Sequence, residues 1–203
     1  KNETSLHTYL KTVDPERAYP ILIDAYYPGK EVEIDAVTDG DNVFIPAIFE
    51  HIEKAGVHSG DSMAVTPPIS LSEDIKEEII SYTRKIARNI PFKGVFNIQF
   101  VIYQDQLYVL EVNPRASRTV PVTSKVTGAN LIEMAVSALL GKKMKHQEAV
   151  FKENNFYTIK SPVFSTNKLP GVDPILVPEM KSTGELIGVA KQFDDSIKKA
   201  LLW

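Results

Sequence analysis

Residues 96–119, with the sequence FNIQFVIYQDQLYVLEVNPRASRT, hold two runs of alternating apolar and polar side chains separated by a short polar stretch. Alternation with a period of two is typical of a β-strand that buries one face. We therefore expect strands at 96–103 and 107–113, paired as an antiparallel hairpin. The apolar face of such a hairpin needs a layer of other elements packed against it.

The register of this hairpin decides which polar side chains meet. With a three-residue loop, Tyr103 faces Leu107 and Gln99 lies directly opposite Glu111, while Asn113 follows two residues later on the same face. A shift of one residue would place Gln99 and Glu111 on opposite faces. The other face is then apolar and consists of Phe96, Ile98, Phe100, Ile102, Tyr108, Leu110 and Val112.

Two interpretations of Gln99, Glu111 and Asn113 stay open on the hairpin alone. They can be ordinary polar side chains on a solvated strand face, or they can form a site for a hard cation, since Mg²⁺ takes oxygen ligands together with water or substrate phosphates. Arg115 and Arg118 follow directly, and arginine matches phosphate oxygens in two-pronged contacts. This proximity favours a site for a metal and a phosphate.

Composition excludes several other classes of protein. The 203 residues carry 23 Lys and Arg against 26 Asp and Glu, a net charge of −3, so there is no general electrostatic reason to bind nucleic acid or an anionic membrane. No apolar run approaches the length of about 20 residues that spans a bilayer. Cysteine is absent, which excludes disulfides and thiolate catalysis.

The rest of the chain mixes strand and helix signals. Strands are expected at 19–26, 31–38, 42–49, 154–163 and 185–190. Helices are expected at 6–13, 70–89 and 131–140, the second with Ser72 as its N-cap. Loops are expected at 51–62 and around Pro170, Pro174 and Pro178. This mixture predicts an α+β domain on a largely antiparallel sheet flanked by helices.

The strand at 31–38 has Val32, Ile34 and Ala36 on one side. Its other side is acidic, and we expect it to be exposed. The acidic residues are Glu31, Glu33 and Asp35.

The segment EVNPRASRT at 111–119 resembles the metal- and phosphate-binding strand of ATP-grasp enzymes, and more narrowly that of the carbamoyl-phosphate synthetase large-subunit family. Four other segments agree with that family: EHIEKAGVHSGDS at 50–62, FNIQF at 96–100, SKVTG at 124–128 and PEMKSTGE at 178–185. The resemblance extends over nearly the whole chain.

That large subunit has two ATP-grasp halves, of which the first phosphorylates bicarbonate and the second phosphorylates carbamate. The segments GVHSGD and PEMKSTGE resemble the second half. The resemblance implies the C-terminal lobe of an ATP-grasp domain at 1–140, and at 141–203 an extension that packs on the same lobe and leads to a regulatory domain. It also implies cytoplasmic, ATP-dependent formation of carbamoyl phosphate with Mg²⁺ or Mn²⁺, and a glutaminase small subunit as partner.

The resemblance also implies roles for individual residues. Gln99, Glu111 and Asn113 would bind the metal ions that bridge the ATP phosphates, with Gln99 and Glu111 also contacting the nucleotide. The catalytic residues Arg115 and Arg118 would face the transferring phosphoryl group or the carbamate. Further nucleotide contacts would come from the backbone of Ala25 and Tyr27 to adenine, from Glu31 to the ribose, and from the loop of Gly56, Val57, His58 and Ser59.

The chain starts at Lys1 without a methionine, stops at Trp203 inside a helical pattern, and shows no glycine-rich loop that would cover a triphosphate. We therefore expect a piece of a longer protein that does not make carbamoyl phosphate by itself. The alternatives are another ATP-grasp carboxylate ligase, such as a biotin carboxylase relative, and a non-catalytic interaction or regulatory piece.

Overall fold

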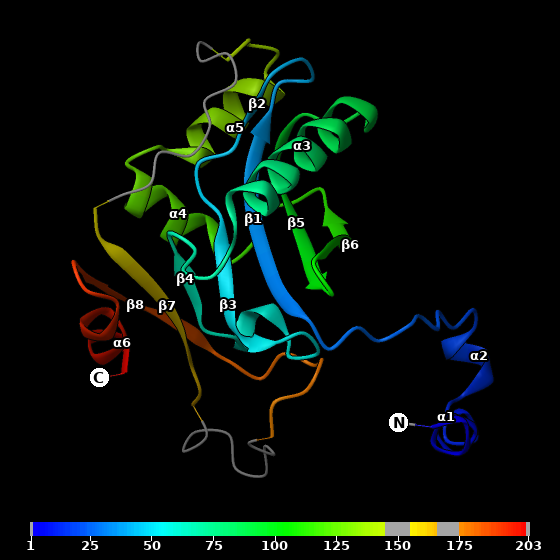
Figure 1. Ribbon diagram of the computed structural model, residues 1–203. Coiled ribbons are helices and arrows are strands. Elements are labelled where there is room, and N and C mark those ends of the chain that lie inside the picture. The colour runs from blue at the N-terminus through cyan, green and yellow to red at the C-terminus, as the bar shows by residue number, and fades with distance from the viewer. Residues whose placement is uncertain (1, 145–154, 166–174, 202–203) are drawn as a thin grey trace.

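The computed structural model describes residues 2–144, 155–165 and 175–201. Within these ranges, one antiparallel sheet of eight strands forms the centre, in the order β6–β5–β1–β3–β4–β7–β8, with β2 paired to β1 (Figure 1). The strands are β1 (Lys30–Thr38), β2 (Val43–Phe44), β3 (Phe49–Lys54), β4 (Ala64–Thr66), β5 (Gly94–Tyr103), β6 (Gln106–Asn113), β7 (Tyr157–Val163) and β8 (Gly184–Ala190).

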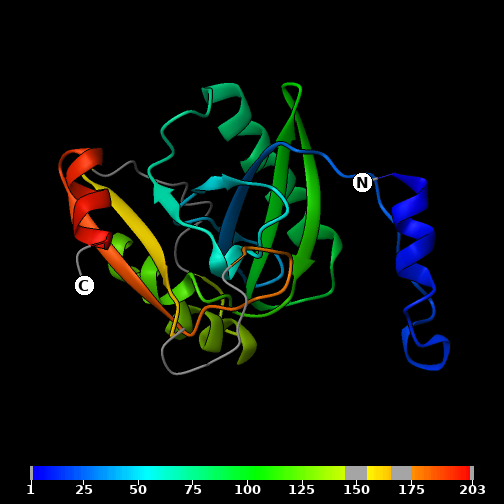
Figure 2. The same cartoon turned by 90° about the horizontal axis from the view of Figure 1, so that it is seen from below.

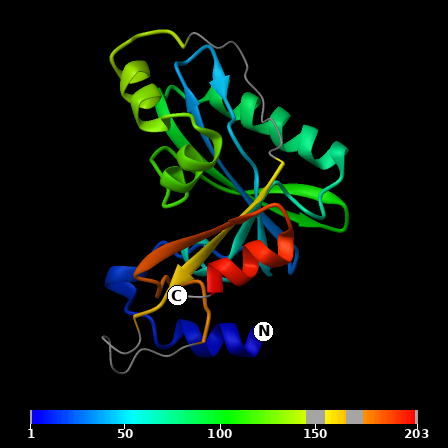
Figure 3. The ribbon, with the colours of Figure 1, turned by 90° about the vertical axis from the view of Figure 1, so that its left-hand side faces the viewer.

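Helices cover both faces of the sheet (Figure 3). Helix α3 (Glu73–Asn89) packs on the face formed by Ile34 and Ile98, and α5 (Leu131–Leu139) packs with α4 (Val120–Thr127) on the opposite face, around Val37 and Val95. Helix α6 (Phe193–Leu201) packs on β7 and β8. The α+β class and the helix-flanked antiparallel sheet expected from the sequence are confirmed.

Helix α3 follows its sequence signals closely. The Ser72 side chain accepts a hydrogen bond from Ile75 N at 3.3 Å, as an N-cap does. Ile79 is fully buried, and Tyr82 and Ile86 pack partly buried beside it. Because this stripe packs against one face of β1 and β5, the opposite face of these two strands is available for the site.

The N-terminal part of the chain differs from the expectation. Helices α1 (Glu3–Leu10) and α2 (Pro15–Ala18) stand to one side of the sheet (Figures 1 and 2). Residues 19–26 do not form a strand, and Leu22 is 84% exposed. The apolar run has β propensity, but a strand also needs a neighbouring strand to pair with, and the described part of the chain offers it none.

The strand predicted at 42–49 and the loop predicted at 51–62 were wrong in their limits. The chain pairs briefly as β2, leaves the ladder around Pro46, and pairs again as β3, which extends to Lys54. Proline cannot donate a ladder hydrogen bond, which explains the interruption. A short 3₁₀ helix, η1 (Ser59–Asp61), and β4 then follow.

The hairpin of β5 and β6 has the expected register at its site end and a different turn. Gln99 pairs with Glu111, but Tyr103 pairs with Gln106, so the loop has two residues and a bulge at Leu110 absorbs the difference. Beyond the bulge the faces exchange: Leu110 is 57% exposed and Leu107 is buried. The prediction that Tyr108 and Leu110 belong to the core face was therefore wrong.

The last strands extend the same sheet, since Ala64 of β4 pairs with Lys160 of β7. The strand expected at 154–163 is β7, although Asn154 itself lies outside the described residues, as do Pro170 and Pro174 of the expected loop. Helix α4 was not predicted, whereas α6 agrees with the helical pattern expected at the end of the chain. Among the described residues, no helix is both long enough and apolar enough to cross a bilayer.

Candidate active site

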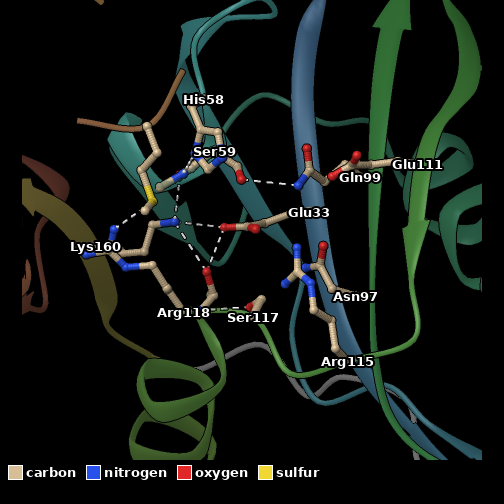
Figure 4. A pocket seen from close by; sticks show the side chains of 13 residues that line it. Glu33, His58, Ser59, Asn97, Gln99, Glu111, Arg115, Ser117, Arg118 and Lys160 are labelled. Carbon is tan, nitrogen blue, oxygen red and sulfur yellow. Dashed lines mark hydrogen bonds and ion pairs between the residues drawn. The ribbon is translucent and has the colours of Figure 1, made fainter. Parts of the chain in front are cut away.

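The site lies on the face of the sheet opposite α3, and its floor is the acidic side of β1. Glu31, Glu33 and Asp35 are each no more than 2% exposed, so the prediction that this side is exposed was wrong. Two loops cover it, one containing η1 and one running from β6 to α4 (Figure 4). Burial of three carboxylates on one strand requires partners for their charge.

The three residues expected to bind metal come together at the edge of this floor. Gln99 and Glu111 are cross-strand partners on β5 and β6, and Asn113 Nδ2 donates to Glu111 Oε1 at 2.8 Å. Gln99 Nε2 donates to Ser59 Oγ at 3.1 Å (Figure 4). Because the amide nitrogens of Gln99 and Asn113 are engaged in these bonds, their carbonyl oxygens and the Glu111 carboxylate are the atoms that a cation would take.

The loop that carries the two arginines is fixed to β1 at two points. Ser117 Oγ donates to Asp35 Oδ2 at 2.7 Å and accepts from Thr119 N at 2.9 Å. Thr119 Oγ1 donates to Glu33 Oε1 at 2.8 Å. Asp35 and Glu33 therefore hold the loop through the residues directly before and after Arg118.

The two arginines differ in how firmly they are held. Arg115 is exposed, and within the described chain its guanidinium donates only to the neighbouring carbonyl of Ala116, at 3.2 Å from Nη1. Arg118 Nη1 donates to Ser182 Oγ at 2.8 Å, and its Nε lies 3.4 Å from Glu185 Oε1. Arg115 is thus free to follow a ligand, whereas Arg118 is oriented by the protein.

The loop expected to contact the nucleotide contains a glycine at a backbone conformation that other residues rarely adopt. Gly56 has φ +108°, in the left-handed region, and a side chain there would meet the Tyr26 ring at 3.2 Å. Tyr26 also donates to Ala55 O at 2.7 Å. His58 Nδ1 accepts from Gly60 N at 3.0 Å, so its remaining ring nitrogen, Nε2, is the one that carries a proton when the ring is neutral.

A buried ion pair joins β1 to the C-terminal strands. Lys160 Nζ lies 2.9 Å from Glu33 Oε1, and also donates to Thr119 Oγ1 at 3.2 Å and Ser59 O at 3.1 Å. His51 lies between two of the acids, 3.6 Å from Glu31 and 3.5 Å from Glu33. Burial acts to raise the pKa of Glu33, but Lys160 and His51 outweigh it and hold that pKa well below its usual range.

The other two acids of β1 respond differently. Burial, reinforced by the charge of Glu33, raises the pKa of Asp35 to about 7 against the hydrogen bonds from Ser117 and Asn97. Burial also raises the pKa of Glu31, partly offset by His51. The floor of the site therefore contains one firmly ionised carboxylate and one that changes charge near neutral pH.

These elements enclose one cavity (Figure 4). Six of the residues singled out from the sequence line it: His58, Ser59, Gln99, Glu111, Arg115 and Arg118. The others lie outside its lining: Ala25, Tyr27, Glu31, Gly56, Val57 and Asn113. Asn113 still reaches the cavity through Glu111. Tyr27 instead stacks on Tyr103, with ring centroids 5.2 Å apart, and makes a tilted contact with Tyr108 at 4.7 Å.

Sequence reasoning missed several residues of the cavity wall: Glu33, Asn97, Gly60, Ser117, Thr119, Lys160 and Met180. The acidic alternation of 31–35 placed Glu33 on one face of its strand, but only the structure shows that this strand is central and that the face is covered. No local signal points to Lys160, which is brought to Glu33 only by the pairing of β7 with β4.

The donor set fits a hard divalent cation. A carboxylate and two amide oxygens are the ligand types that Mg²⁺ prefers, with room left for substrate phosphate oxygens. Arg115 and Arg118 stand in the same cavity, where they can balance phosphate charge.

The fold defines the chain as part of an ATP-grasp domain. It superimposes on a biotin carboxylase–β,γ-ATP complex from Campylobacter jejuni with a TM-score of 0.73 and 17% identity, over 98% of this chain and 51% of that one. The biotin carboxylase domain of Hydrogenobacter thermophilus 2-oxoglutarate carboxylase, solved with MgADP and bicarbonate, gives a TM-score of 0.66 and 19% identity, over 83% and 39%. At these identities the likeness concerns the fold alone.

The sequence places the chain more narrowly. Residues 15–147 match the family described as "Carbamoyl-phosphate synthase L chain, ATP binding domain", and the chain belongs to this family. It is 52% identical to the arginine-specific carbamoyl phosphate synthase large chain of Halalkalibacterium halodurans, over 100% of this chain and 20% of the relative. It is 48% identical to the large chain of Clostridium botulinum, over 99% and 19%. The chain thus spans about a fifth of the length of these relatives.

Proposed function

We propose that this chain is the metal- and phosphate-binding lobe of the carbamate-phosphorylating half of a carbamoyl-phosphate synthase large chain. One observation carries the proposal: Gln99, Glu111 and Asn113 meet at one edge of a cavity that also receives Arg115 and Arg118. The relatives at about 50% identity are named carbamoyl phosphate synthase large chains. The family likeness of the segments at 56–61 and 178–185 supports the second half over the first.

In this proposal Glu111 would hold magnesium together with Gln99 and Asn113, and the ion would supply positive charge against the ATP phosphates. Arg115 and Arg118 supply positive charge where the phosphoryl group passes to carbamate, so that the protein contributes positioning and electrostatics rather than a covalent step. Glu31 would accept from the ribose, and the backbone of Ala25, Tyr27 and the loop at 56–59 would contact the nucleotide.

The division of labour along the chain follows from the same proposal. Residues 1–140 would form the lobe itself and 141–203 an extension on it that leads to a further domain. The remaining nucleotide contacts and the glutaminase subunit that supplies ammonia would come from outside this chain. We accordingly propose that the isolated chain binds MgATP weakly and forms no carbamoyl phosphate.

Glu111→Ala in the full-length protein tests the proposal. It should abolish ATP formation from MgADP and carbamoyl phosphate, which reports the carbamate half, and spare bicarbonate-dependent ATP hydrolysis, which reports the other half. Glu77→Ala, an exposed acid on α3 at the opposite face of the sheet, is the matched control and should change neither activity.

Three results would contradict the proposal. Equal loss of both activities would contradict the assignment to the second half. Full retention of ATP formation would remove Glu111 from the site. A wild-type protein that carboxylates biotin and makes no carbamoyl phosphate would instead be a biotin carboxylase relative.

A further inference from the structure

We infer that Ser182 and Asp61 are positioning residues for Arg118. They join the segment 177–182 to the loop of residues 58–61 and thereby fix the Arg118 guanidinium at the cavity of the candidate site. This inference rests on the proposed function, in which Arg118 serves phosphoryl transfer. Neither Ser182 nor Asp61 was expected to have a role from the sequence, and both are buried, at 7% and 0% exposure.

The two segments are joined by a set of hydrogen bonds across about 120 positions of sequence. Asp61 Oδ2 accepts from Lys181 N at 2.7 Å, and Asp61 Oδ1 accepts from Ser182 N at 2.8 Å. Ser182 Oγ donates to Gly60 O at 2.9 Å, and His58 N donates to Val177 O at 3.1 Å. The segment 177–182 is therefore attached to the loop of residues 58–61, three of which line the cavity beside the metal-binding edge.

Asp61 suits this role because its carboxylate is ionised. Burial acts to raise its pKa, but the hydrogen bonds from Ser182 and Lys181 outweigh burial and lower the pKa below its usual value. A charged acceptor makes stronger hydrogen bonds to backbone N–H groups than a neutral one does. The hydrogen bonds from Lys181 N and Ser182 N to Asp61 are thus strong at neutral pH, and they fix the position of Ser182.

Ser182 transmits this position to Arg118. Its hydroxyl has one hydrogen to donate and two lone pairs. Since the hydrogen goes to Gly60 O, the oxygen is presented as an acceptor, and Arg118 Nη1 donates to it at 2.8 Å. Met180 Sδ, 3.1 Å from the same nitrogen, and Glu185 Oε1, 3.4 Å from Nε, complete the cradle. Arg118 is therefore oriented before any ligand arrives.

The consequence concerns kcat more than nucleotide affinity. Catalysis by positive charge depends on where that charge stands when the phosphoryl group is in transit. Loss of the Ser182 hydroxyl leaves Arg118 in place along the chain but lets its guanidinium take other orientations. We expect Ser182→Ala in the full-length protein to lower kcat for ATP formation from MgADP and carbamoyl phosphate about 10-fold or more, with KM for MgADP changed less than about twofold.

A double-mutant cycle separates positioning from simple damage to the fold. If Ser182 acts through Arg118, Ser182→Ala should lower kcat in the wild-type background but by less than about twofold when Arg118→Ala is already present. Thr183→Ala is the matched control: it removes the adjacent hydroxyl, which donates to Val163 O, and should leave kcat unchanged. Should Ser182→Ala unfold the protein in a thermal scan, Ser182→Cys, of similar volume and weaker acceptor strength, replaces it in the cycle.

Each outcome decides the inference. Wild-type kcat in Ser182→Ala, or an equal fold loss in both backgrounds, overturns it. A wild-type protein without carbamoyl phosphate activity ends the proposed function separately. The positioning inference is then judged by a crystal structure of Ser182→Ala, in which the Arg118 guanidinium should move away from residue 182; an unmoved guanidinium overturns it.

Discussion

Lys160 and Glu33 stand 127 positions apart in sequence and form an ion pair of 2.9 Å in which both side chains are at least 97% buried. This pair attaches β7 to the floor of the site, since Lys160 also holds Thr119 at the end of the arginine loop. The stability of the chain should depend on it strongly, because a single buried charge is costly once its partner is removed.

Lys160→Met should lower the free energy of unfolding by about 3–5 kcal/mol, since it leaves the Glu33 carboxylate buried without its main partner. Adding Glu33→Gln to Lys160→Met should restore part of the lost free energy of unfolding, because the unpaired buried charge is then removed. Denaturant unfolding of the three proteins measures both effects. Lys125→Met, at an exposed position of α4, is the control and should change stability by less than about 0.5 kcal/mol. A similar small change at Lys160 would mean that the pair does not contribute.

Asp35 should make stability depend on pH in the opposite direction to an ordinary carboxylate. Burial raises its pKa from 3.8 to about 7 in the folded chain. Between these values the folded state holds a proton that the unfolded state has lost, so the free energy of unfolding falls as pH rises. The decrease is complete above pH about 7 and is on the order of a few kcal/mol.

Asp35→Asn removes this titration and keeps a group that can accept from Ser117. The variant should therefore match the wild type near pH 4 and exceed it increasingly up to pH 8, as denaturant unfolding across that range would show. A difference between variant and wild type that is constant with pH would contradict the raised pKa.

The site end of the hairpin could be predicted because its sequence leaves little choice. Ile98 and Phe100 must face the core, so Gln99 and Glu111 must share the other face. The turn could not be predicted in the same way, since the bulge at Leu110 compensates for a loop shorter by one residue. Both solutions satisfy the alternation near the site, and only the tertiary packing of Leu107 decides between them.

The acidic strand shows a second limit of sequence reasoning. Alternation in β1 correctly assigns Glu33 to the side opposite the core, but alternation does not reveal what covers that side. The cover comes from Thr119 and Lys160, which are distant in sequence. A local pattern predicts which side chains share a face, whereas the partners of that face depend on topology.

Gly188 should be essential to the packing of α6 on β8. A Cβ at this position would lie 2.6 Å from Ala200 N and would also overlap Ser196 O. Both are backbone atoms of α6 and cannot move aside separately, so Gly188→Ala should lower the free energy of unfolding by about 1–3 kcal/mol or more. In Gly184→Ala, on the same strand, the nearest atom to the new Cβ is Val163 Cβ at 3.7 Å, and stability should hardly change. Equal unfolding curves for the two variants would contradict this close approach of α6.

The turn between β5 and β6 offers a gain in stability. Gln104 and Asp105 both have positive φ, 51° and 58°, and the strands are joined by these two residues alone. A two-residue turn with both φ values positive favours Asn-Gly, because a β-carbon raises the energy of the left-handed region by about 1–2 kcal/mol for most residues. Replacing the pair by Gln104→Asn and Asp105→Gly should raise the free energy of unfolding by about 1 kcal/mol. Asp105→Ala should lower it, since alanine keeps the β-carbon and lacks the local hydrogen bonds of aspartate.

Because the bulge at Leu110 separates the turn from Glu111, neither change should alter MgATP affinity in the full-length protein. A loss of stability with Asn-Gly, measured by denaturant unfolding, would contradict the two-residue turn and with it the bulge that restores the register at the site.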